Sequence, residues 1–154
     1  MNYLITGGLG LIGKKLTDQL IKRGHKVVVV DNQKLKKKKR NYIYYKIDIT
    51  KKNDLLKNYL KKHKINSIIH LAAFLGVKTT EQSPEQVIKV NFNGTKNVLY
   101  SCLKSKVREF IFSSSSEVYG DQRSKFRENL TLIPKSFYGF SKYQAELIVK
   151  NFSI

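Results

Sequence analysis

Short apolar runs alternate with longer amphipathic segments along this chain. Five of the runs are predicted to be strands, at residues 2–6, 26–30, 42–47, 67–71 and 109–113. Several of these runs are apolar on both faces, which is typical of strands covered by helices on both sides of a sheet. The alternation of strand and helix therefore predicts repeated βα units around a parallel sheet.

Helical periodicity fills most of the segments between the predicted strands. Ile12, Leu16 and Leu20 recur at every fourth position and predict the first helix. Further helices are predicted at residues 53–62, at residues 84–104 and from near residue 136 to the end. Ser83 and Pro84 provide a cap and a first-turn proline for the helix at 84–104. Residues 116–134 are predicted to be a polar loop, and nothing resembles an interdomain linker, so we expect one domain.

A glycine-rich turn, TGGLGLIG, joins the first strand to the first helix. It satisfies two overlapping patterns, G-x-G-x-x-G from Gly8 and G-x-x-G-x-x-G from Gly7. Glycines there allow a tight turn, let a pyrophosphate approach the backbone, and place the helix N-terminus against the anion. The strand–turn–helix context indicates dinucleotide binding. The residues predicted to contact the dinucleotide here are Gly7, Gly10, Leu11, Ile12 and Gly13.

An acidic residue, Asp31, ends the second predicted strand and is followed by Asn32. A carboxylate at this position accepts hydrogen bonds from both ribose hydroxyls of the adenosine and repels a 2′-phosphate. Asp31 therefore favours NAD over NADP. The lysines from Lys34 onward leave that preference incomplete, because they could accommodate a phosphate.

The composition limits the class of protein without naming a function. The 154 residues carry a formal net charge of +19, and lysine is plentiful throughout. The densest basic block, KLKKKKR at residues 34–40, has no interleaved aromatic residues, so a solvated loop is favoured over a nucleic-acid or anion site. The single cysteine, Cys102, fits a reducing compartment. With no predicted leader peptide, membrane span or metal site, we expect a cytoplasmic protein.

Three further motifs complete a recognisable series: HLAA at 70–73, SSSSEVYG at 113–120 and YGFSK at 138–142. With the glycine turn and Asp31, they resemble the extended short-chain dehydrogenase/reductase superfamily, and most closely its NAD-dependent nucleotide-sugar epimerase/dehydratase branch. The resemblance implies a Rossmann-like doubly wound parallel sheet, an NAD cofactor, a nucleotide-sugar substrate and a homodimer. Family members are much longer, so we expect residues 1–154 to be an incomplete NAD-binding domain, truncated after the helix with Tyr138 and Lys142 and lacking the substrate domain.

The same resemblance implies cofactor contacts beyond the glycine turn. Asp48 and Ile49 match the pair that holds the adenine ring, and Asn91 matches a helix asparagine that supports the site. His70 is interpreted as structural, because its neighbours make the cofactor contact. The fourth-strand residues that line the cofactor are Leu71, Ala72 and Ala73. The resemblance further implies that Tyr138 and Lys142 contact the cofactor as well as taking part in catalysis.

The catalytic pair can be argued from spacing. Tyr138 and Lys142 are four residues apart, so on a helix they share a face. We expect the ammonium, together with an oxidised nicotinamide, to lower the pKa of the tyrosine, which could then remove a proton from a sugar hydroxyl. The resemblance assigns the catalytic serine to Ser115, three residues before the valine of VYG, and places the strand-end residues Ser113 and Ser114 near the cofactor.

The two residues after Ser115 separate the branches of the family. Sugar-nucleotide 4,6-dehydratases carry Asp-Glu there, whereas this chain has Ser116 and Glu117. The elimination acid is therefore missing, and the Ser-Glu pair resembles decarboxylases and many epimerases. Glu117 could assist the chemistry or bond within the loop. The leading hypothesis is an NAD-dependent epimerase; the alternatives are a decarboxylase-like enzyme and an NAD-binding fragment without turnover.

Overall fold

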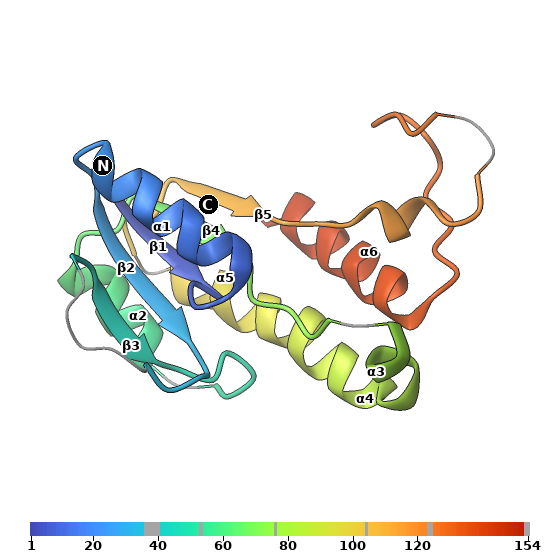
Figure 1. Ribbon diagram of the computed structural model, residues 1–154, viewed down its shortest axis with the longest axis horizontal. Helices are drawn as coiled ribbons and strands as arrows, with labels where there is room; N and C mark the ends of the chain where they lie inside the picture. Colours follow the sequence, from blue (N-terminus) through green and yellow to red (C-terminus); the bar gives the residue numbers. More distant parts are fainter. Residues whose placement is uncertain (36–40, 53, 76, 104, 123–124, 153–154) are drawn as a thin grey trace.

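Five parallel strands form the centre of the computed structural model, which describes residues 1–35, 41–52, 54–75, 77–103, 105–122 and 125–152 (Figure 1). The strands are β1 (Asn2–Thr6), β2 (Lys26–Asp31), β3 (Ile43–Lys46), β4 (Ser67–His70) and β5 (Glu109–Phe112), in the spatial order β3-β2-β1-β4-β5. From β1 the chain adds β2 and β3 on one side of the sheet, and then β4 and β5 on the other side. The change of side lies between β1 and β4, where a doubly wound sheet has its ligand crevice. The predicted fold class is confirmed.

Helices cover both faces of this sheet. They are α1 (Leu11–Lys22), α2 (Leu55–Lys62), α3 (Val77–Gln82), α4 (Pro84–Val87), the π-helix η1 (Ile88–Gly94), α5 (Thr95–Cys102), the 3₁₀ turn η2 (Ser116–Tyr119) and α6 (Phe137–Lys150). The sequence predicted neither α3 nor η2. Two predicted helix ends, at residues 53 and 104, lie outside the described residues, as do residues 36–40 of the basic block.

The core is divided by the alternation of side chains along the strands. Ile5 and Val29 face α1, where they pack with Leu20. Leu4 and Val28 face the other way, into a cluster that contains residues of α2 and α5. Because helices bury both faces, the central strands can be apolar at every position. The sheet is therefore a rigid base for the loops at its carboxyl edge.

The segment predicted as one helix at 84–104 contains a π-helical stretch, η1, between α4 and α5. Wide turns of this kind are frequent at functional sites. Asn91 lies within η1 and is buried, and the hydroxyl of Thr95 donates to the Asn91 carbonyl at 2.6 Å. The stretch thus carries the site asparagine on the side packed against α6.

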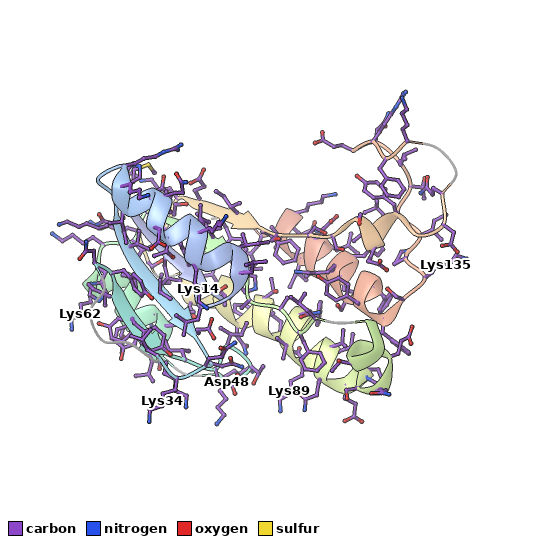
Figure 2. The ribbon with its side chains drawn as sticks, viewed as in Figure 1. Lys14, Lys34, Asp48, Lys62, Lys89 and Lys135 are labelled. Carbon is purple, nitrogen blue, oxygen red and sulfur yellow. The ribbon has the colours of Figure 1, made fainter. Side chains whose placement is uncertain are left out.

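The positive charge is distributed over many elements. The lysines labelled in Figure 2 come from α1, the loop after β2, α2, η1 and the loop before α6. This distribution agrees with a chain-wide lysine excess. Within the described part of the chain, no helix has the length and apolar character needed to cross a membrane.

Candidate functional site

The glycine turn brings β1 against the end of β4. Gly7 has φ of +66°, and a Cβ on it would lie 2.7 Å from the backbone nitrogen of Ala72. A Cβ on Gly13 would lie 2.5 Å from the Gly7 carbonyl oxygen. Larger side chains at either position would therefore displace backbone. Glycine is required at both positions because three backbone segments approach closely there. Because the turn carries no side chains at these positions, a ligand can reach its backbone.

The N-terminus of α1 opens beside this turn. Gly10 is the N-cap, makes no side-chain capping bond, and is followed by a first turn without an acidic residue. The side chains of Leu11 and Ile12 are 85% and 64% exposed. The first N–H groups of a helix have no partner inside the helix and favour negative charge. This end of α1 can accordingly receive a pyrophosphate.

Asp31 has a structural role in addition to the one predicted. Its carboxylate accepts a hydrogen bond from the Leu9 N–H at 2.9 Å and another from the Gln33 N–H at 3.0 Å. The side chain therefore ties the glycine turn to the end of β2. Each carboxylate oxygen can accept more than one bond, so the group can hold a ribose as well.

A cavity of about 220 Å³ collects most of the predicted cofactor residues. Those that line it are Gly7, Gly10, Asp31, Asn32, Asp48, Ile49, Leu71, Ala72 and Ala73. Those that do not are Leu11, Ile12, Gly13, Asn91, Ser113, Tyr138 and Lys142. Lining residues that the sequence did not indicate include Gln33, Thr50, Leu75 and Val90. Thr50 could have been found from its place two residues after Asp48.

Asp48 is held ready to accept hydrogen bonds. Burial raises its pKa, but hydrogen bonds from the Thr50 hydroxyl and N–H, with the charges of Lys51 and Lys89, lower the pKa overall. Both Thr50 bonds go to the same carboxylate oxygen, at 2.8 and 2.9 Å. Figure 2 shows Asp48 and Lys89 at the same edge of the molecule. The second oxygen of an ionised carboxylate can thus accept from an adenine amino group.

Lys142 lies on α6, and its ammonium lies next to the carboxyl end of β5. The residue is 3% exposed, and Nζ donates to the Ser113 carbonyl at 2.7 Å. Nζ also lies 4.7 Å from the centre of the Phe112 ring. Burial lowers the pKa of Lys142 to about 8, although the charge of Glu146 opposes that shift. The lysine therefore anchors α6 to the serine tract.

Tyr138 lies one helical turn before Lys142 and beside the serine tract. Burial raises the pKa of the phenol, a hydrogen bond with Ser115 lowers it, and the charge of Glu117 raises it, with a net increase. The expectation that the Lys142 ammonium lowers this pKa is not met by the protein groups alone. Nζ is 6.0 Å from the Tyr138 ring centre and is engaged with the Ser113 carbonyl.

Glu117 contacts the beginning of α6. Its carboxylate accepts a hydrogen bond from the Ser136 hydroxyl at 3.0 Å, and that hydroxyl accepts the Gly139 N–H as the N-cap of the helix. A Cβ on Gly139 would lie 2.5 Å from the Glu117 carbonyl oxygen. Of the two interpretations left open, this geometry favours local bonding of the Glu117 side chain.

Both ring nitrogens of His70 take part in a series of buried hydrogen bonds, in which each donor and acceptor can be assigned. Thr95 Oγ1 donates to the Asn91 carbonyl, so it accepts from His70 Nε2 at 3.0 Å. Nδ1 then accepts from Thr6 Oγ1 at 2.6 Å, and that oxygen accepts from the Ala72 N–H. Burial and the charge of Lys142 lower the His70 pKa to about 3. His70 is therefore neutral and protonated on Nε2.

Asn91 continues this network to the helix with the tyrosine. Its Oδ1 accepts from the Phe74 N–H at 2.7 Å, and its Nδ2 donates to Ser141 Oγ at 3.0 Å. Ser141 in turn donates to the Tyr138 carbonyl at 2.7 Å. Buried side chains thus connect the cofactor cavity to α6. A larger hollow of about 530 Å³, between α2 and α5, contains Ile49 as its one predicted cofactor residue among the described ones.

Two curated proteins resemble this chain over much of its length. It is 43% identical over 129 residues to UDP-N-acetyl-alpha-D-glucosaminuronate decarboxylase from Bacillus cytotoxicus, covering 82% of this chain and 40% of that protein. It is 34% identical over 160 residues to UDP-glucuronate 4-epimerase from Thermodesulfobacterium geofontis, covering 95% of this chain and 49% of that protein. The chain spans about half or less of the length of these relatives.

Solved structures show the same arrangement. UDP-glucose 4-epimerase from Thermotoga maritima, determined with UDP-glucose, has a TM-score of 0.90 and 34% identity, covering 99% of this chain and 51% of that one. The enzyme of the same name from Thermus thermophilus, in complex with NAD, has a TM-score of 0.89 and 27% identity, covering 99% and 50%. Residues 3–153 match the family described as NAD dependent epimerase/dehydratase, and the chain belongs to that family.

Proposed function

We propose that this chain is the NAD-binding part of a nucleotide-sugar epimerase, with Tyr138, Lys142 and Ser115 as its catalytic residues. The observation that carries the proposal is the cavity in which the glycine turn, Asp31 and Asp48 meet. Its residues come mainly from the segments at the carboxyl ends of β1, β2, β3 and β4, and they match the pyrophosphate, the adenosine ribose and the adenine of a dinucleotide. Membership of the family supports the assignment.

The residues present fit NAD. The open backbone at Gly7 and the uncapped N-terminus of α1 suit the pyrophosphate, Asp31 with Asn32 the adenosine ribose, and Asp48 with Ile49 the adenine. When bound, NAD supplies a hydride acceptor and a positively charged ring. Asp31 disfavours a 2′-phosphate by charge repulsion, so NAD is preferred to NADP.

Removal of the proton from the sugar hydroxyl depends on the protein's own side chains. The Ser115 hydroxyl lowers the pKa of the Tyr138 phenol, and Ser115 directly follows the strand-end residues Ser113 and Ser114. Because protein groups alone raise the pKa of Tyr138, the phenol is protonated near neutral pH. A positive charge beside it favours the phenolate that can remove a proton from a sugar hydroxyl. Lys142, fixed by the Ser113 carbonyl, contributes to that charge.

Calorimetric titration with NAD tests the cofactor assignment. We expect binding by the 154-residue chain, weakened by at least about tenfold in Asp31→Ala because a charge-assisted bond is worth roughly 1.5–3 kcal/mol. The matched control is Asp18→Ala, an exposed carboxylate on α1. Since Asp31 also holds the Leu9 N–H, thermal melting must show that Asp31→Ala is folded at the titration temperature. Absence of NAD binding by the folded wild type would end the proposal.

A decarboxylase is the second candidate, because the 43% identical relative carries that name. Product analysis separates the two activities: carbon dioxide released from a UDP-uronic acid indicates decarboxylation, and an epimer detected by proton NMR indicates epimerisation. Tyr138→Phe should abolish either activity and leave NAD binding intact. Turnover is expected to be low with residues 1–154 alone, because they span about half the length of the relatives.

We also propose a homodimer through α5 and α6, in the cytoplasm. Exposed apolar side chains on these helices include Leu103, at the end of α5, and Leu147. The single cysteine, Cys102, is buried and unpaired, which suits a reducing compartment. Light scattering should show a dimer for the wild type and a monomer for Leu147→Glu. A monomeric wild type at micromolar concentration would refute the dimer.

A further inference from the structure

The end of β5 is attached to α6 at two successive residues. Ser113 accepts a hydrogen bond from Lys142 Nζ through its carbonyl oxygen, at 2.7 Å. Ser114, the next residue, donates its hydroxyl to the carboxylate of Glu146. Lys142 and Glu146 are four residues apart on α6, so they lie one above the other on the same face. Two adjacent positions of the tract therefore meet two adjacent turns of one helix.

This attachment determines where the next residue lies. Ser115 follows directly, in extended conformation, and its hydroxyl accepts the Glu117 N–H at 3.2 Å. Ser115 also lowers the pKa of Tyr138, which is one turn before Lys142 on α6. Because β5 pairs with β4 on one side and lies at the edge of the described sheet on the other, no second strand of that sheet fixes the tract that follows β5, and its contacts with α6 do so.

Glu146 also contributes a charge close to Lys142. The other charged or titratable groups that face this ammonium are His70 on β4, which is neutral, and Tyr138 on α6. Glu146 is the group whose charge favours the protonated lysine against the effect of burial. Its carboxylate is bonded to the Ser114 hydroxyl, which holds it at this position.

We propose that Glu146 is a positioning residue: by bonding Ser114 it holds the serine tract on α6 and so aligns Ser115 and Lys142 with Tyr138. Glu146 was not among the predicted site residues, and Ser114 was expected only to lie near the cofactor as a strand-end residue. The inference rests on the proposed function for the roles of Tyr138, Lys142 and Ser115. It extends that function by giving the second serine of the tract and a carboxylate outside the cavity a defined task.

Hydrogen–deuterium exchange of residues 113–119 tests the attachment without cofactor or substrate. Ser114→Ala and Glu146→Ala should each speed exchange of these amides by about fivefold, the effect of losing one hydrogen bond that limits local opening. Ser114→Thr keeps the hydroxyl and should restore slow exchange. The matched controls are Ser116→Ala, in the same tract, and Glu109→Gln, at the other end of β5, both at exposed positions.

Glu146→Gln separates the charge from the hydrogen bond, because the amide oxygen still accepts. Exchange of residues 113–119 should stay slow, while the titration midpoint of Lys142, followed by NMR and assigned from Lys142→Arg, falls below the wild-type midpoint. Unchanged exchange in both Ser114→Ala and Glu146→Ala would overturn the proposal, as would an unchanged Lys142 midpoint in Glu146→Gln. Because no ligand is present, these outcomes are independent of NAD binding, on which the proposed function stands.

Discussion

The two halves of the candidate site are built in different ways. The cofactor region, formed by the glycine turn and the ends of β2, β3 and β4, rests mainly on the central strands β1, β2 and β4, whose side chains are mostly buried, and takes Asp48 and Ile49 from the segment after the edge strand β3. Its shape comes from backbone segments in close contact, as at Gly7 and Ala72. The catalytic region, formed by residues 113–119 and α6, follows the edge strand of the described sheet. Its parts are joined by side-chain hydrogen bonds.

This difference predicts different responses to substitution. Close-packed backbone cannot relax when a methyl group is inserted, so a change in the cofactor region should destabilise the fold and remove the ligand site together. Side-chain hydrogen bonds contribute about 1 kcal/mol each, so losing one in the catalytic region should misalign reacting groups while the fold survives. Four variants test whether the two regions respond differently.

The largest effect is expected for Gly13→Ala in the cofactor region. The new Cβ would lie 2.5 Å from the Gly7 carbonyl oxygen and 2.6 Å from the Gly8 Cα. Overpacking against backbone should lower the free energy of unfolding by about 1–3 kcal/mol, and NAD binding should be lost. Urea denaturation and calorimetry measure the two effects. The control is Gly24→Ala, which meets no atom within 4 Å and should keep NAD binding despite its φ of +78°; wild-type affinity in Gly13→Ala would refute the prediction.

His70, in the network between the two regions, should give stability a specific pH dependence. Its folded pKa of about 3 is below the ordinary 6.5, so below pH 6.5 the unfolded chain gains a proton that the folded chain excludes. Stability should therefore fall with pH from 6.5 toward 3, by up to about 1.4 kcal/mol per unit. Urea denaturation of wild type and His70→Gln should show their difference shrinking by about 2 kcal/mol from pH 6.5 to pH 5.

His63→Gln provides the comparison for that measurement. The His63 pKa is also lowered, chiefly by burial, but the side chain is only partly buried and bonds the Tyr45 hydroxyl near the surface. The difference between this variant and wild type should change less with pH. An equal change in both histidine variants would show that the buried network has no special role.

Gly139→Ala tests whether the catalytic region can be disturbed alone. Its Cβ would lie 2.5 Å from the Glu117 carbonyl oxygen, so η2 must move away from α6. We expect a loss of about 1–2 kcal/mol, faster hydrogen exchange over residues 115–119, and NAD affinity close to wild type. A loss of NAD binding as severe as that of Gly13→Ala would show that the two regions behave as one unit.

The smallest effect is expected for Ser136→Ala, at the N-cap of α6. The hydroxyl accepts the Gly139 N–H and donates to Glu117, so its loss should cost about 1 kcal/mol. Ser83→Ala is the matched control, because Ser83 occupies the N-cap of α4 without a side-chain capping bond. Thermal denaturation should separate the two variants. Equal losses would mean that the cap on α6 contributes nothing particular.

Structural features could be predicted from the sequence where their physical cause lies within one short segment. The glycine turn, the acidic end of β2 and the first-turn proline of α4 each have a short-range physical cause, and the strands were predicted within about one or two residues, the usual precision of such boundaries. The π-helical stretch at Asn91 was not predicted, because its wide turn follows from packing against α6 and the loop after β4. The 3₁₀ turn after the serine tract was likewise assigned to loop.

The alternation of strands and helices, the dinucleotide turn, and the spacing that puts Tyr138 and Lys142 on one helical face can all be predicted from the amino-acid sequence. Each of these depends on neighbours within a few residues. The tautomer of His70, the raised pKa of Tyr138 and the attachment of Ser114 to Glu146 become visible once the chain is folded. These properties depend on burial and on hydrogen-bond partners distant in the sequence, which are set when β4, β5, η1 and α6 pack together.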